Sequence, residues 1–330
     1  MPSSTRPAPA GDERAWSGGR IVGIDIARWW ALMGMVATHV LVAVRPGGGG
    51  ITTVQAVAGG RASALFAVLA GVSMALLSGG VRPVSGDARR GARRGLLVRA
   101  ALIAGWGLIL GQLGTSIAVI LTYYGALFVL GLPFLGLRTR SLVPLALGWA
   151  VLAPLLSFWL RPHLPDRLDA SPVLADLGHP ALLAGQLLFT GVYPAFSWLA
   201  YLLLGLAIGR TSLDRRRVAV ALVGWGTVAA VTSYAASRAL LAAPGVRAEL
   251  AATLPPGMNR GGLDLTLAWG MLGVTPTGST WWLAVLTPHS GDAVRPGPHR
   301  WLRGRRDRAQ PAGPPSWRPR PLSVLFGAGR

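Results

Sequence analysis

Long apolar stretches alternate along the chain with short polar loops. The hydrocarbon core of a bilayer is about 30 Å thick, so a helix needs around 20 mostly apolar residues to cross it. Eight stretches come close to this length or exceed it: 21–44, 56–78, 95–113, 116–135, 142–160, 182–209, 218–241 and 265–286. The pattern predicts an all-α membrane protein, a polytopic helical bundle of about eight transmembrane helices.

The sixth stretch is too long for one simple span, and it contains Tyr193 followed by Pro194. Proline in the first turn of a helix removes no helical hydrogen bond, because the first N–H groups have no partner within the helix. We therefore expect an interfacial segment up to this point and a spanning helix from about Pro194.

Arginine is concentrated in every second loop. These residues are Arg82, Arg89, Arg90, Arg93, Arg94, Arg138, Arg140, Arg210, Arg215, Arg216 and Arg217. Cytoplasmic loops of membrane proteins carry an excess of basic residues. The loops after the second, fourth and sixth stretches are therefore expected in the cytoplasm, together with the N-terminus. The other loops hold fewer basic residues or balance them with acids such as Asp166 and Asp169.

The composition agrees with this class of protein. Only 13% of the residues are charged, about half of what a soluble domain carries, and the mean hydropathy is +0.47. The net charge of +20 comes from arginine, since the chain has no lysine. The loop positions of the arginines favour the positive-inside rule, so no nucleic-acid partner is expected. With no cysteine and five scattered histidines, neither a disulfide nor a metal site is expected.

Both ends of the chain differ from its middle. Residues 1–19 are rich in Pro, Ser and Gly and predict a disordered cytoplasmic tail,. The composition changes again after Asp292, and residues 293–330 are rich in Arg and Pro. A solvated basic tail that contacts anionic lipid is one interpretation. An abrupt change of this kind is also typical of a shifted reading frame, which predicts that native C-terminal helices are missing. The transmembrane domain is expected over 20–292.

Ionisable residues inside a bilayer are costly and need a partner or a function. The first stretch contains Asp25 and Arg28, three positions apart and hence on one helical face,. They are expected about one turn from the cytoplasmic end. One interpretation is an ion pair that fixes the register of the helix; the other is that Arg28 binds an anionic group from the cytoplasm.

His39 lies about 21 Å from Asp25 along the same helix, given a rise of 1.5 Å per residue. Arg61 begins the second stretch at the same expected depth. Imidazole accepts and returns protons near neutral pH, so His39 is a candidate general base for an external acceptor. Arg61 is a candidate ligand for a polar acceptor or an oxyanion. The alternatives are an interfacial histidine and a snorkelling arginine.

Aromatic residues provide weaker candidates for substrate binding. Tyr123 and Tyr124 lie in the middle of the fourth stretch, and Tyr193 and Trp198 open the sixth span. Placement in an aromatic belt at the membrane interface is the alternative for the second pair. No nucleotide-binding loop, nucleophile elbow or zinc-protease motif occurs in a convincing context.

The segments RIVGIDIARWWALMGMVATHV and GRASALFAVLAGVSMALLSGG resemble bacterial, especially actinobacterial, membrane proteins of the heparan-alpha-glucosaminide N-acetyltransferase-like family. TYYGALFVLGLPFLGLR, YPAFSWLAYLLLGLAIGR and TPHSG resemble later blocks of the same family, so the resemblance covers about 20–292. It implies a multi-pass acyltransferase of the bacterial plasma membrane. Cytoplasmic acyl-CoA, as acetyl-CoA, would be the donor, and an amino or hydroxyl group of an external sugar or envelope glycan the acceptor.

The resemblance also matches individual residues of the first helix, without assigning a catalytic role to any of them. Asp25 and Arg28 match the D-x-x-R motif of the first helix, and His39 occupies the position of the histidine in bacterial members. On this hypothesis the CoA site consists of Asp25, Arg28, Arg89, Arg90, Arg93 and Arg94. His39 and Arg61 act in catalysis, and membrane lipids and a second copy of the chain are further expected partners.

Two departures from the family pattern stand out. Trp29 occupies the position where the family has glycine, and the chain turns Arg/Pro-rich where the family continues with apolar helices. Two other functions therefore stay open: a transporter or flippase in which the buried charges line a substrate path, and an inactive, truncated member of the family.

Overall fold

The computed structural model describes residues 21–41, 50–115, 117–165, 171–254, 262–269, 271 and 273–285. The expected tails, 1–19 and 293–330, lie outside these residues. All described elements are helices. The α-helices are α1 (Val22–Val40), α2 (Thr53–Ala58), α3 (Arg61–Leu77), α4 (Gly86–Gly111), α5 (Leu121–Gly131), α6 (Thr139–Leu160), α7 (Pro180–Gly185), α8 (Ala195–Gly209), α9 (Arg216–Leu241), α10 (Val246–Ala252) and α11 (Gly262–Trp269). Short helical turns include η3 (Leu132–Gly136), η6 (Gln186–Thr190) and η8 (Thr280–Ala284).

Within the described ranges, four helical segments are long and apolar enough to cross a membrane: Thr53–Leu77, Gly86–Gly111, Thr139–His163 and Arg216–Leu241. A fifth span is possible if Pro180–Thr190 and Ala195–Gly209, bent by 58°, count together. The prediction of an all-α membrane protein is thus confirmed, while the count of about eight spans stays a prediction. The expected helix over 265–286 is wrong as one element, because α11 ends at Trp269 and the described residues beyond it are non-helical up to η8.

The break expected at the sixth span is confirmed. The helix that includes α7 and η6 ends at Thr190, and α8 restarts directly after Pro194. The third span differs from expectation, because α4 already begins at Gly86 and not near residue 95. The first two turns of α4 are therefore polar helix, and the arginines at 89–94 belong to the helix rather than to a loop.

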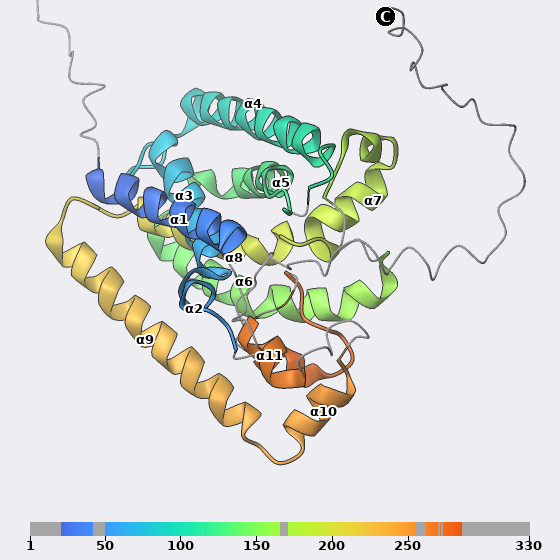
Figure 1. Cartoon of the computed structure of the whole chain (residues 1–330). Coiled ribbons are helices and arrows are strands. Elements are labelled where there is room, and N and C mark those ends of the chain that lie inside the picture. Colours follow the sequence, from blue (N-terminus) through green and yellow to red (C-terminus); the bar gives the residue numbers. More distant parts are fainter. Residues whose placement is uncertain are drawn as a thin grey trace, which may run out of the picture. The chain divides into compact units, whose positions relative to one another are not determined.

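Helices α3 and α8 form the centre of the main hydrophobic core (Figure 1). Their backbones touch at two glycines: a Cβ atom built on Gly71 would lie 2.1 Å from the carbonyl oxygen of Leu202, and one on Gly205 would lie 1.9 Å from that of Val68. Small residues allow such close approach between membrane helices. The small residues Ala62, Ser63, Ala67, Ala70 and Gly71 of α3 are buried, and Ser73 is half-buried.

The residue pairs at each interface give the direction of every core helix. Val68 and Val72 lie beside Gly205 and Gly209, so α3 and α8 run parallel. Helices α1 and α3 are antiparallel, because Arg28 bonds to Ser73 and Gly34 lies beside Ala62. Helices α4 and α5 are antiparallel, because Gly125 lies beside Ala104 and Gly107 beside Thr122. The hydrogen bonds from Trp149 to Phe196 and from Thr139 to Ala207 show that α6 and α8 are antiparallel as well. The ends of α3, η3 and α8 and the starts of α1, α4 and α6 consequently lie at one end of the core. We call it the arginine-rich end, because the arginine loops predicted to share one side of the membrane meet there.

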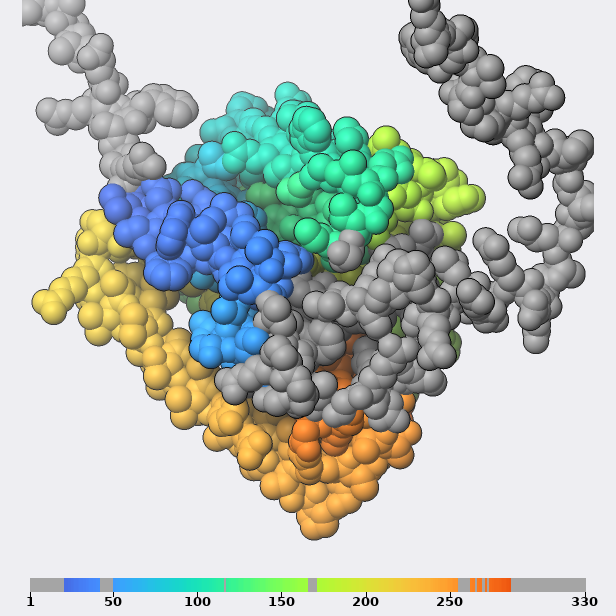
Figure 2. All heavy atoms as spheres, in the orientation of Figure 1, coloured from blue at the N-terminus to red at the C-terminus, as the bar shows by residue number. Residues whose placement is uncertain are grey.

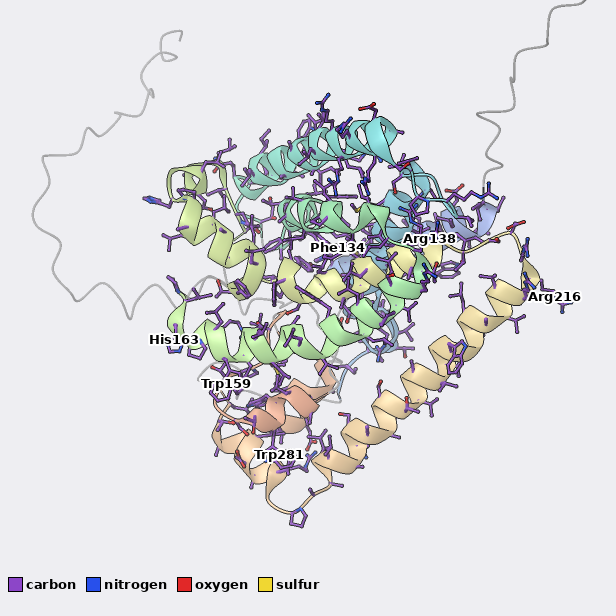
Figure 3. All side chains as sticks on the ribbon, turned by 180° about the vertical axis from the view of Figure 1, so that it is seen from behind. Phe134, Arg138, Trp159, His163, Arg216 and Trp281 are labelled. Carbon is purple, nitrogen blue, oxygen red and sulfur yellow. The ribbon has the colours of Figure 1, made fainter. Side chains whose placement is uncertain are left out.

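Figure 3 shows this direction for α6, with Arg138 at one end of the helix and Trp159 and His163 at the other. Helix α9 runs apart from the central helices (Figures 1 and 2), and Ser237 is its one buried residue. Large apolar side chains along α9 are exposed, among them Val223 and Trp225. An apolar helix exposed all round is suited to lipid contact.

We predict that Gly205→Ala destabilises the protein, because its methyl group would collide with the backbone of α3. Overpacking of this kind costs about 1–3 kcal/mol, which corresponds to a fall of roughly 5 °C in melting temperature. Thermal unfolding in detergent, followed by tryptophan fluorescence, measures the effect. Gly224→Ala in α9 is the matched control, since a Cβ there meets nothing within 4 Å. Equal melting temperatures for both variants would contradict the packing described here.

Candidate anion-binding site at the arginine-rich end

The site begins where α3 ends. The N–H groups of Gly79 and Gly80 donate to the carbonyl oxygens of Leu76 and Ala75, which is the hydrogen-bond pattern of a Schellman motif,. Gly79 has a φ of +100°, and a Cβ atom on it would lie 2.3 Å from the carbonyl oxygen of Arg82. Only glycine fits this turn, which directs the chain into the loop 81–85.

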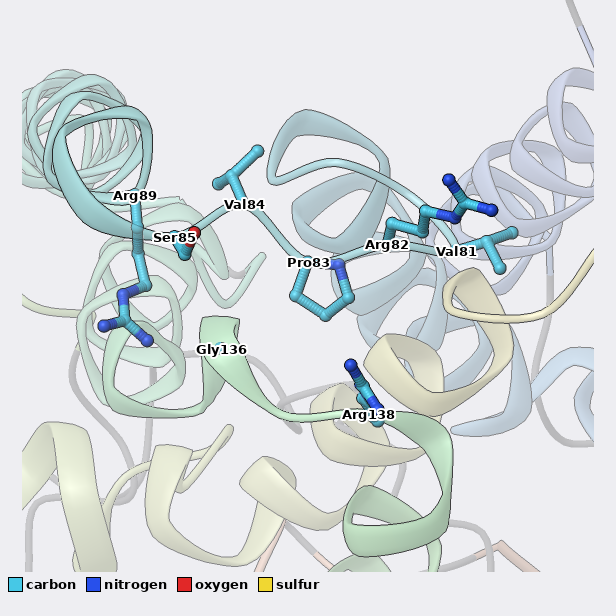
Figure 4. Close-up of a pocket in the computed structure, with 8 residues that line it drawn as sticks. All are labelled: Val81, Arg82, Pro83, Val84, Ser85, Arg89, Gly136 and Arg138. Carbon is cyan, nitrogen blue, oxygen red and sulfur yellow. The ribbon is translucent and has the colours of Figure 1, made fainter.

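A pocket of about 550 Å³ lies between this loop and the segment 136–138. Its lining consists of Val81, Arg82, Pro83, Val84, Ser85, Arg89, Gly136 and Arg138 (Figure 4). In Figure 4, Arg89 descends from α4 and Arg138 rises from the start of α6, while the guanidinium group of Arg82 points outward. The lining has three arginines and no carboxylate, so the pocket has the electrostatics of an anion site.

Two helices begin at this pocket. Ser85 is the N-cap of the 26-residue α4, and its side chain makes no capping hydrogen bond. Arg138 is the N-cap of the 22-residue α6. Helix N-termini present free N–H groups and a partial positive charge, both of which favour phosphate and carboxylate. Backbone and side chains therefore contribute charge of the same sign.

The guanidinium group of Arg89 occupies space that a glycine leaves open. A Cβ atom on Gly136 would lie 2.5 Å from its Nη1 atom. Arg93 lies one turn further along the same face of α4 and is half-buried, and its Nε atom has no hydrogen-bond partner among the described residues. Arg89 and Arg93 thus both face inward from α4 at the arginine-rich end.

Arg210 follows α8 directly and is 3% exposed. Its Nη1 atom donates to the carbonyl oxygens of Ala75, Ser78 and Gly80 at 2.9, 3.2 and 2.7 Å. Its Nη2 atom donates to the Ser78 hydroxyl at 2.8 Å and to the carbonyl oxygen of Leu135. Burial lowers the pKa of Arg210, although guanidinium groups remain protonated in proteins. These oxygens therefore compensate a buried positive charge.

The structure separates the arginines expected to bind CoA. Arg89 lines the pocket, whereas Arg90 forms an exposed ion pair with Asp87 and Arg94 is exposed outside the lining. Asp25 and Arg28 do form the expected ion pair, at 3.2 Å. Arg28 also donates to the Ser73 hydroxyl at 2.9 Å. That hydrogen bond ties α1 to α3 and supports the interpretation of the pair as a register contact.

His39 and Arg61 lie at the opposite end of the antiparallel pair α1–α3, as their depths predict. His39 is half-buried in the last turn of α1. Arg61 opens α3, is exposed, and donates to the carbonyl oxygen of Ala56 in α2. Trp29 does not obstruct the packing of α1, because its ring is 54% exposed and stacks edge-on against Trp30.

Three of the four candidate aromatics form one buried group beside the broken span. The rings of Tyr123 and Tyr193 lie 5.7 Å apart, and those of Tyr193 and Trp198 5.3 Å apart. Tyr124 instead packs against Phe66 of α3, at 5.2 Å. Gln186 and Thr190 at the break are also buried. Burial means that Trp198 is a core residue and not part of an interfacial aromatic belt.

Sequence analysis did not assign Arg82, Ser85, Arg138 or Arg210 to a site, although three of them served as markers of orientation. The serine directly before the polar start of α4 was a usable signal for a helix N-terminus. Within the described ranges, no group of three or more metal-ligating side chains lies together. The predicted absence of a metal site stays a prediction.

Apolar helices with a basic pocket at one end define a multi-pass membrane protein. The model of the heparan-alpha-glucosaminide N-acetyltransferase catalytic family matches residues 20–242. The chain therefore belongs to this family and to the membrane acyltransferases. No curated protein and no solved structure matches it. The match ends at residue 242, short of residue 292, where the resemblance was expected to end.

We predict that inorganic pyrophosphate protects the pocket from chemical modification. The chain has no cysteine, so Ser85→Cys introduces a single reactive thiol at the exposed lip of the pocket. A bound anion would block access, and the rate of maleimide labelling should fall with increasing pyrophosphate until the pocket is saturated. Ser212→Cys, outside the lining, provides the control. Equal rates at both positions with and without pyrophosphate would contradict an anion site.

Proposed function

We propose that the protein is an acetyltransferase that moves an acetyl group from cytoplasmic acetyl-CoA to an amino or hydroxyl group of an extracytoplasmic sugar or envelope glycan. Family membership supports the reaction class. The proposed binding site for the donor rests on one observation: Arg82, Arg89 and Arg138 line a pocket at which α4 and α6 begin.

The phosphate-rich end of CoA suits this pocket. Guanidinium groups bind phosphate with charge-assisted, often bidentate hydrogen bonds, and free N–H groups at helix N-termini add to them. Arg89 and Arg138 would hold the phosphates, with Arg82 attracting them from solvent. The arginine-rich end would face the cytoplasm, in agreement with the positive-inside rule, so the pocket would open to the compartment that contains acetyl-CoA.

The acyl group would travel toward the opposite end of α1 and α3. The eleven residues from Arg28 to His39 correspond to about 16 Å of helix, a distance that calls for an extended donor such as the pantetheine arm. His39 would accept the proton of the acceptor group as its nitrogen or oxygen bonds to the acetyl carbon. The C–S bond then breaks, and the CoA thiolate takes up a proton. Arg61 would stabilise the developing oxyanion.

The buried aromatic group at the broken span would support the acceptor site from within the core, since it lies near the starts of α5 and α8, at the same end as His39 and Arg61. Membrane lipids would surround the apolar helices, above all α9, whose exposed side chains are suited to them. The location that fits these proposals is the plasma membrane of a bacterium.

We predict that Arg89→Gln and Arg138→Gln each raise KM for acetyl-CoA about tenfold with little change in kcat. A charge-assisted hydrogen bond contributes about 1.5–3 kcal/mol, and each 1.4 kcal/mol is tenfold in affinity. The absence of cysteine lets released CoA thiol be measured without background. Arg94→Gln is the matched control, on the same helix but outside the pocket. An unchanged KM in both pocket variants would exclude this donor site.

We predict that His39→Ala lowers kcat by about a hundredfold or more, the usual contribution of a general base. Arg61→Ala should reduce kcat by a similar factor of about a hundred, through loss of oxyanion stabilisation. Neither variant should change the affinity for CoA, because both residues lie far from the pocket. His163→Ala provides a control histidine. Unchanged turnover in both variants would refute these roles while leaving the family assignment intact.

A further inference from the structure

One buried arginine contacts the residue that directly precedes each wall of the pocket, without lining the pocket itself. The first wall is the loop 81–85, which follows Gly80, and the second is the segment 136–138, which follows Leu135. Arg210 donates to the carbonyl oxygens of Gly80 and Leu135. Those two carbonyl groups belong to the residues directly before each wall.

We propose that Arg210 is a positioning residue that sets the spacing of the two pocket walls and thereby the affinity for the donor phosphates. This inference rests on the proposed function, since it concerns how the donor site is held in shape. Arg210 touches none of the reacting atoms, and it acts through Arg89 and Arg138, whose positions depend on the walls.

The hydrogen bonds of Arg210 are suited to this role. A guanidinium group is planar and presents five N–H donors in a fixed fork, whereas lysine has a single flexible ammonium group. Nη1 donates hydrogen bonds to three carbonyl groups at the end of α3, and Nη2 donates to the hydroxyl group of Ser78 and the carbonyl group of Leu135. One rigid group therefore joins three segments: the end of α8, the end of α3 and the last turn of η3.

The environment of Arg210 differs from that of an ordinary ion pair. Among the described residues, its partners are uncharged oxygens, and the side chain is 3% exposed. A buried charge with no carboxylate partner is stabilised by the dipoles of the carbonyl and hydroxyl groups around it. Displacement of either wall would move some of these groups away from Arg210. Because the lost hydrogen bonds could not be replaced by water, movement of either wall costs free energy.

Further hydrogen bonds near Arg210 hold the first wall and the residue directly after the second. The N–H group of Val84 donates to the carbonyl oxygen of Ser78 at 3.0 Å, and the hydroxyl of Thr139, which follows the second wall, donates to the carbonyl oxygen of Ala207 at 3.2 Å. Arg210 is the residue that bridges these two sets of contacts. A lysine in its place would keep the charge and yet could not reach both walls in the same geometry.

The test compares Arg210→Lys with the unchanged protein by two measurements. Affinity for CoA is measured through protection of a Ser85→Cys thiol, and we expect Kd to rise about tenfold, the effect of one lost charge-assisted hydrogen bond. Wall spacing is followed between spin labels on Arg90→Cys and Arg140→Cys, which lie outside the lining near the starts of α4 and α6, the helices that follow the two walls. We expect a broader distance distribution.

Gly111→Ala serves as a stability control, because a Cβ atom there would lie 2.1 Å from the carbonyl oxygen of Pro172, at the end of α4 that is far from Arg210 and the walls. At a temperature where all variants are folded, Gly111→Ala should retain the Kd and the narrow distance distribution. An unchanged Kd or an unchanged distribution in Arg210→Lys would overturn the inference, as would an equal effect of Gly111→Ala. If the unchanged protein does not bind CoA, the proposed donor site fails, and the inference fails with it even where the walls move.

Discussion

The backbone contact between α3 and α8 is the constraint on which the rest of the structure depends. It requires glycine at positions 71 and 205, because the carbonyl oxygens of the facing helix occupy the space of a side chain. Because the two helices are parallel, both of their C-termini lie at the same end of the core. Helices α1, α5 and α6 pack around this pair, and the loops that follow α3 and α8 consequently meet.

A shared end for two helix C-termini creates an electrostatic problem, since the partial negative charges of unpaired carbonyl groups accumulate there. The buried positive charge of Arg210, at the end of both helices, compensates these partial negative charges. The starts of α4 and α6 lie at the same end and carry the opposite partial charge. Carbonyl groups bind Arg210 inside the arginine-rich end, and the N-cap residues of α4 and α6, Ser85 and Arg138, line the pocket.

Local signals in the sequence predicted local features well. The break at Pro194 was predictable because proline removes no hydrogen bond in the first turn of a helix and therefore marks where a helix can start. The start of α4 was not predicted, because the search for apolar stretches does not detect a polar helical turn. The first turn of α4 is polar and contains Asp87, which pairs with Arg90. The pocket was not predictable, since Leu135 and Gly80, which precede its walls, lie 75 and 130 positions from Arg210 and meet it only through tertiary contacts.

The separation of charge between the two ends of the core bears on which chemistry the fold can support. Arg89 and Arg138 line the pocket at the arginine-rich end, while His39 and Arg61 lie at the opposite end of α1 and α3. A reaction confined to one end would use only one of these sets. A donor whose charged part binds at one end and whose reactive part extends along the helices would use both. The thioester of acetyl-CoA, on a long uncharged arm beyond its phosphates, has this division of charge.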